Sequence, residues 1–74
     1  MNQISNNPNR IMRMREVCQI VGLSRATLYR LLKLGRFPPS IRLSFSAVGW
    51  RADAVALWLT ERELESAPNN YSIH

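Results

Sequence analysis

A short segment of the chain gathers basic and aromatic side chains at close spacing. The stretch GLSRATLYRLLKLGRFPP, residues 22–39, contains Arg25, Tyr29, Arg30 and Lys33. Like charges this close on one helix repel each other, so an isolated helix gains nothing from the arrangement. An arginine donates two hydrogen bonds to O6 and N7 of guanine, and a tyrosine contacts a phosphate or a thymine methyl group. The cluster therefore predicts an external counterpart, and double-stranded DNA fits it.

The groups that enzyme chemistry needs are missing from the sequence. His74 is the only imidazole and occupies the last position, and no glycine-rich phosphate loop is present. Cys18 is the only cysteine, which excludes an internal disulfide and leaves a metal without companion ligands. We therefore predict a protein that is not an enzyme and that has no catalytic residues, cofactor, metal site or small-molecule ligand.

The charge is distributed unevenly along the chain. Residues 1–51 carry nine basic side chains and one acidic side chain, a formal charge of +8, whereas residues 52–74 carry one basic and four acidic side chains, a formal charge of −3. A basic region of this kind is where a polyanion is expected to bind. The sequence shows neither a signal-peptide pattern nor a long apolar run. We expect a cytoplasmic, nucleoid-associated protein with no membrane partner.

A first helix is predicted from apolar spacing. In MREVCQIVGL, apolar residues from Met14 to Val21 recur at the i, i+3, i+4, i+7 positions of an amphipathic helix, which predicts a helix over residues 13–21. Gly22 then occupies the position that often ends a helix.

A second predicted helix carries the basic cluster. Ser24 is a suitable N-cap, and the helix is predicted to run to about Leu34. At 100° per residue, the apolar side chains share one face and the basic ones the opposite face. The inward residues are Leu28, Leu31 and Leu32; the outward residues are Ala26, Tyr29, Arg30 and Lys33, with Arg25 and Thr27 on the flanks.

The rest of the chain predicts a small hairpin and a third helix. Apolar and polar residues alternate on both sides of residues 44–47, which indicates a hairpin, and residues 52–66 have helical spacing. Two helices joined by a glycine turn form a helix-turn-helix, and the hairpin forms its wing. We predict a mainly α winged helix-turn-helix, in the order helix, helix, hairpin wing, helix. Its boundaries are a disordered leader over 1–10, a DNA-binding domain over 11–66 and a flexible tail over 67–74.

Four short motifs carry a resemblance to a known family. GLSRATLYR, G-x-FP, VGWR and V-x-x-WL occur here in that order and at matching spacing. In these motifs the chain resembles the AlpA-type prophage regulators, which are related to excisionase and MerR-type winged DNA-binding domains. The resemblance implies base reading by Ser24, Arg25, Thr27, Tyr29 and Arg30, backbone contact by the wing around Arg42, and core positions for Trp50 and Trp58.

Together, the residues and the resemblance predict a sequence-specific double-stranded DNA-binding regulator of a bacterial prophage or integrated element. It would control transcription of integrase or excision genes, or act directly as an excisionase, that is, a recombination directionality factor. Paired or tandem sites imply self-association, and integrase or RNA polymerase are candidate protein partners. The residues predicted to contact the DNA backbone are Arg13, Arg15, Lys33, Arg36, Arg42 and Arg51.

The alternative hypothesis is a small protein-interaction module, such as an adaptor or an antitoxin-like partner. Leu57 and Leu64 lie opposite the inward stripe of the third helix, and Phe45 lies at the predicted wing tip, where the related proteins often carry glycine and a basic residue. These three side chains are the candidate protein contacts. For Phe45 we favour packing back onto the domain over contact with a neighbouring copy.

Overall fold

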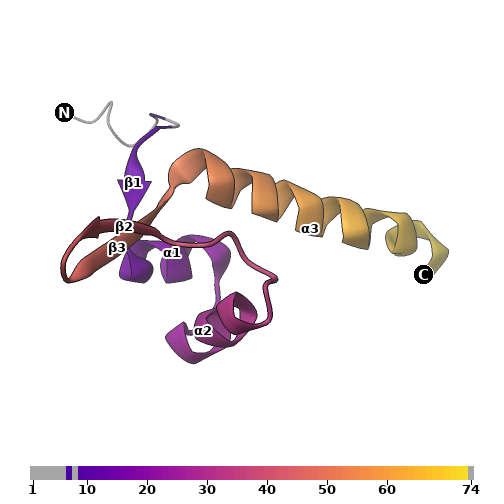
Figure 1. Ribbon diagram of the computed structural model, residues 1–74. Helices are drawn as coiled ribbons and strands as arrows, with labels where there is room; N and C mark the ends of the chain where they lie inside the picture. Colours follow the sequence, from indigo (N-terminus) through magenta and orange to yellow (C-terminus); the bar gives the residue numbers. More distant parts are fainter. Residues whose placement is uncertain (1–6, 8, 74) are drawn as a thin grey trace.

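The computed structural model describes Asn7 and residues 9–73 (Figure 1). Its elements are β1 (Ile11–Met12), α1 (Met14–Val21), α2 (Arg25–Lys33), β2 (Ile41–Ser44), β3 (Ala47–Arg51) and α3 (Ala52–Ile73). The predicted fold class, a mainly α winged helix-turn-helix with a β-hairpin, is confirmed. Most of the predicted leader, residues 1–6 and 8, lies outside the described part of the chain.

The turn between α1 and α2 depends on a glycine. Gly22 has φ of 75°, a left-handed conformation that favours glycine, and its amide and that of Leu23 both donate to the carbonyl of Cys18, at 2.9 and 3.2 Å. These bonds end α1 and turn the chain. The side chain of Ser24 then caps α2, accepting a hydrogen bond from the amide of Thr27. Both boundaries agree with the prediction to within a residue or two.

The sheet has three antiparallel strands in the order β1, β3, β2. Met12 pairs with Trp50, and Arg42 pairs with Val48. β1 has no counterpart in the predicted elements, because two residues are too few to show alternation. Arg10, which the prediction placed in the leader, belongs to the domain, since its carbonyl accepts a hydrogen bond from the amide of Ala52 at 2.9 Å.

The core lies where the sheet, α1, α2 and α3 meet. Phe37 is at its centre: its ring makes edge contacts with Trp50 and Trp58, at centroid distances of 6.1 and 4.8 Å. Trp50 is buried as expected, whereas Val48, two residues earlier, is partly exposed. The buried apolar residues are Met12, Val17, Leu28, Phe37, Trp50 and Val55.

α3 runs along the side of the molecule opposite α2 (Figure 1). Its inward stripe begins with the buried Val55, and the partly buried Trp58 packs against the core. The helix continues to Ile73, beyond the end predicted near residue 66, so that the predicted tail over 67–74 is helical through Ile73. The helix extends past Pro68, although a proline inside a helix removes a backbone hydrogen bond and its ring crowds the carbonyl four residues earlier.

Candidate nucleic-acid interface

The outer face of α2 carries the basic and aromatic side chains that the sequence singled out. Leu28 is fully buried, and packing of Leu31 and Leu32 against the same core fixes the rotation of the helix. On the opposite side Tyr29 is 52% exposed. The other exposed residues of this face are Arg25, Ala26, Arg30 and Lys33. The small Ala26 lies among them, which permits close approach of a ligand to the helix backbone.

The cations of this face are not neutralised within the described part of the chain. The three ion pairs there involve Arg10, Arg51 and Arg62. No described carboxylate lies within 4.0 Å of Arg25, Arg30 or Lys33. An unpaired cluster of like charges is unfavourable for the free helix. The α2 face, defined here as Arg25, Ala26, Tyr29, Arg30 and Lys33, is therefore suited to an anionic ligand.

Two hydrogen bonds between Ser24 and Thr27 hold the first turn of α2. The Ser24 hydroxyl accepts from the Thr27 amide at 3.1 Å and donates to the Thr27 hydroxyl oxygen at 3.0 Å. Both contacts of the Ser24 hydroxyl thus lie within the first turn of the helix. The amides of Arg25 and Ala26 have no partner within the helix, and helix N-termini of this kind attract phosphate.

The residues predicted to contact the DNA backbone lie on several different parts of the molecule, and Lys33 among them belongs to the α2 face. Arg13 and Arg15 lie at the start of α1, Arg36 follows α2, and all three are exposed. Arg42 lies on β2, where its guanidinium donates to the Phe45 carbonyl at 3.4 Å. None of these four arginines has an ion-pair partner among the described residues.

Arg51 differs from the other backbone candidates because it is already engaged. Its guanidinium contacts Asp53 at 2.8 Å and the side chain of Asn9 at 2.7 Å. The hydrogen bond from Arg51 lowers the pKa of Asp53. A phosphate would have to compete with this carboxylate for the guanidinium. Arg51 is thus less available than the sequence analysis expected.

The expectation that Phe45 packs back onto the domain is wrong. Its side chain is 95% exposed at the turn between β2 and β3. Only Phe45 and Ser46 separate the strands, so the turn projects the ring away from the sheet and leaves it no surface to cover. Leu57 and Leu64 are exposed as expected, at 59% and 64%.

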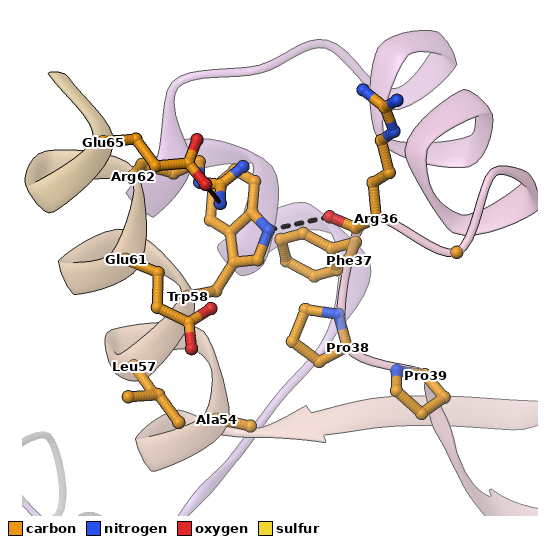
Figure 2. Close-up of a pocket in the computed structure, with 11 residues that line it drawn as sticks. Arg36, Phe37, Pro38, Pro39, Ala54, Leu57, Trp58, Glu61, Arg62 and Glu65 are labelled. Carbon is orange, nitrogen blue, oxygen red and sulfur yellow. Dashed lines mark hydrogen bonds and ion pairs between the residues drawn. The ribbon is translucent and has the colours of Figure 1, made fainter.

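Two tryptophans that the sequence analysis treated only as core residues also fix the segment between α2 and β2. The indole N–H of Trp50 donates to the Pro38 carbonyl, and that of Trp58 donates to the Arg36 carbonyl, each at 2.8 Å. Figure 2 shows the second bond beside Phe37. The sequence predicts only that the Phe37-Pro38-Pro39 run ends the helix. The backbone carbonyls in and next to this run have no regular helix or strand partners, which is the signal for hydrogen bonds from the indole N–H groups.

Comparison with known proteins identifies the family. The model of the family described as prophage CP4-57 regulatory protein (AlpA) matches residues 10–63. The chain belongs to the AlpA family. AlpA proteins are phage-related DNA-binding regulators, as the resemblance in the four motifs implied.

A phage protein is a further relative of this AlpA chain. It is described as uncharacterized protein ORF88 of Enterobacteria phage P4, and it is 40% identical over 53 residues. The match covers 72% of this chain and 60% of the phage protein, so the chain spans well under the full length of that relative. No solved structure matches the chain. Within the described residues, no helix is both long enough and apolar enough to cross a membrane.

Proposed function

We propose that this AlpA-family protein binds double-stranded DNA by inserting α2 into the major groove. The observation that carries the proposal is the exposed α2 face, where Arg25, Arg30 and Lys33 stand without carboxylate partners among the described residues. The major groove admits an α-helix, and it presents the donors and acceptors that distinguish base pairs.

The residues of the interface divide by the part of the duplex that they contact. Arg25, Tyr29 and Arg30 read base edges, and the Thr27 hydroxyl assists them. Ser24 supports this reading by holding the first turn of α2, because its hydroxyl is hydrogen-bonded to the Thr27 amide and side chain. Contacts to phosphates set the register of the protein on the duplex. They come from Arg13, Arg15, Lys33, Arg36, Arg42 and Arg51, and Arg51 first has to loosen its pair with Asp53.

Membership of the AlpA family supports a biological role in phage-related regulation. We propose that the protein regulates a prophage or integrated element by controlling transcription of its integrase or excision genes, at the nucleoid of a bacterial cytoplasm. Direct action as an excision factor would use the same DNA surface. Occupancy of a promoter with a changed transcript level supports regulation, whereas occupancy and bending of an attachment region support excision. Contact with RNA polymerase or integrase would use side chains outside the α2 face, such as Leu57 and Leu64.

Selection of bound fragments from a random duplex pool tests the proposal. The parent protein is expected to enrich one short motif, and Arg30→Ala is expected to lose the preference at one position while remaining folded by circular dichroism. Each lost bidentate contact costs about 1–3 kcal/mol of discrimination. Arg62→Ala is the matched control, because Arg62 lies on α3, pairs with Glu65 and stacks on Trp58. A parent protein that enriches no motif would refute sequence-specific binding.

A further inference from the structure

The molecule carries an apolar knob at one end and a groove at the other. The knob is the Phe45 side chain, 95% exposed at the β2–β3 turn. The groove lies between α3 and the segment that joins α2 to β2. Figure 1 shows the β2–β3 turn and this segment on opposite sides of the molecule, with α2 below and between them. The two features are therefore too far apart to meet within one chain.

The groove has a volume of about 680 Å³ and walls from two elements. Leu57 and Glu61 of α3 form one wall, and Pro38 and Pro39 form the other (Figure 2). Trp58 joins the two walls, since its indole N–H donates to the Arg36 carbonyl at 2.8 Å. Pockets of a few hundred Å³ hold whole small ligands, so an aromatic side chain and its turn fit this space.

Each end of the molecule offers an unpaired charge. Four charged residues line the groove, namely Arg36, Glu61, Arg62 and Glu65. Arg62 pairs with Glu65, whereas no described cation lies within ion-pair distance of the Glu61 carboxylate. At the other end the Arg42 guanidinium lies beside the Phe45 backbone, donating to its carbonyl at 3.4 Å, and has no carboxylate partner in the described part of the chain. On a second copy, an aromatic ring next to a cation thus faces a groove that has Leu57 and Pro38 on its walls and the unpaired Glu61 carboxylate beside them.

We propose that the groove binds the wing tip of a second copy of this protein, with Phe45 of one copy inserted between Leu57 and Pro38 of the next. In the free protein Arg42 then approaches Glu61 across the contact; on DNA, where Arg42 is a proposed phosphate contact, the inserted Phe45 ring holds the two copies together. Knob and groove are different surfaces, so the contact is head-to-tail and leaves a free knob and a free groove at the ends of each pair. Such a contact extends into a chain of copies.

The contact is expected to be weak in the free protein. A phenylalanine buries about 150–250 Å², whereas stable protein interfaces bury about 1,200 Å² or more. Two copies on adjacent DNA sites have a much higher effective concentration, which makes a weak contact useful. This cooperative consequence rests on the proposed DNA binding; the contact itself does not.

Photocrosslinking in the free full-length protein tests the contact without DNA. The photoreactive residue p-benzoylphenylalanine replaces Phe45, and a mixture of 14N- and 15N-labelled chains distinguishes crosslinks between copies. We expect intermolecular crosslinks to the peptide that contains Leu57 and Glu61. Leu57→Glu should lower the yield at least about tenfold, equivalent to about 1.4 kcal/mol, while Leu64→Glu, an equally exposed change on the same helix outside the groove, should leave it unchanged. Crosslinks elsewhere, or equal loss with both variants, would overturn the proposal.

A mixing experiment on DNA tests the head-to-tail arrangement. A duplex carrying two adjacent copies of the selected motif is titrated with Phe45→Ser, with Leu57→Glu and with an equal mixture. Each variant alone should bind single sites like the parent and lose cooperativity on the double site, and the mixture should regain part of it, because one intact knob meets one intact groove. Cooperativity retained by both variants, or not regained by the mixture, would overturn the proposal, whereas failure on single sites would count against DNA binding instead.

Discussion

Ser24 illustrates how one residue can support a binding surface without contacting the ligand. Its hydroxyl accepts a hydrogen bond from the Thr27 amide and is hydrogen-bonded to the Thr27 hydroxyl. Both hydrogen bonds therefore lie inside the first turn of α2. The turn then holds Arg25 and Ala26, whose amides remain free. The family resemblance implied base reading by Ser24, and the hydrogen bonds to Thr27 also let Ser24 position the start of α2.

Ser24→Ala is expected to destabilise the domain by about 1 kcal/mol, because the Thr27 amide loses its cap. For a domain of this size, that lowers Tm by about 4–8 °C. Thermal unfolding followed by circular dichroism measures the change. Ser24→Asp should restore most of the loss, and Ser40→Ala, in an exposed loop, should have no effect. An unchanged Tm for Ser24→Ala would contradict the capping role.

Arg10 and Glu16 attach the start of the domain to α1. The Arg10 guanidinium donates to Glu16 through both terminal nitrogens, one of them at 3.1 Å. This hydrogen bonding lowers the pKa of Glu16 below its ordinary value of 4.5. Ionised Glu16 therefore stabilises the fold at pH values above its unfolded pKa, and this contribution is lost as the pH falls through the lowered folded pKa.

Glu16→Gln should reduce the loss of stability between neutral pH and pH 3. Urea unfolding at several pH values measures the slope, which should be shallower than in the parent but not flat, because the pKa of Asp53 is also lowered. The control is Glu63→Gln, an exposed carboxylate outside the three ion pairs of the described residues. Identical pH profiles for the parent and Glu16→Gln would refute this role.

Among the elements, the pairing of β1 with β3 depends on a close approach at Gly49. A Cβ at this position would lie 2.6 Å from a methyl carbon of Ile11, 3.0 Å from the Met12 carbonyl oxygen and 3.1 Å from a methyl carbon of Leu43. The Ile11 and Leu43 side chains can rotate, but the Met12 oxygen belongs to the neighbouring strand. A side chain at position 49 therefore requires both the Ile11 side chain and the Met12 backbone to shift.

Gly49→Ala is expected to destabilise the protein by about 1–3 kcal/mol through overpacking. Hydrogen exchange should show the loss first in the amides of β1 and β3, since β1 has to move. Val48→Ala, on the opposite face of the same strand, should cost less. If Gly49→Ala unfolded at the same urea concentration as the parent, the close approach would not be a requirement of the fold.

Elements with a repeating pattern could be predicted from the sequence, and single contacts could not. The i, i+3, i+4, i+7 spacing and Gly22 identified α1, and the leucine stripe fixed the outward face of α2. β1 is too short to produce a pattern. The Arg10–Glu16 pair and the indole bonds to the Arg36 and Pro38 carbonyls join residues whose proximity is set by tertiary packing.

At the scale of the whole molecule, the basic α2 face and the acidic side chains of α3 lie on opposite sides of the fold. The molecule is flat, with extents of 47 × 31 × 16 Å, and α2 and α3 lie on opposite sides of it (Figure 1). α3 carries Asp53, Glu61, Glu63 and Glu65. With α2 in a DNA groove, this acidic helix faces away from the phosphates, which avoids repulsion between like charges.

The salt dependence of DNA binding should reflect this charge distribution. If about five phosphates are neutralised, log K against log salt has a slope of about −4 to −5. Fluorescence anisotropy with a labelled duplex at several salt concentrations measures it. Arg13→Ala should reduce the slope by about 1 and weaken binding to all sequences alike. A slope near zero would be incompatible with the proposed phosphate contacts.

The most direct test of major-groove binding by α2 is dimethyl sulfate footprinting of the selected site. The reagent methylates guanine N7 in the major groove and adenine N3 in the minor groove. We predict that the parent protein protects guanine N7 within the motif, and that Arg30→Ala loses this protection at one guanine while retaining its fold. Protection confined to adenine N3, or an unchanged footprint with Arg30→Ala at the same affinity, would contradict the placement of α2 in the major groove.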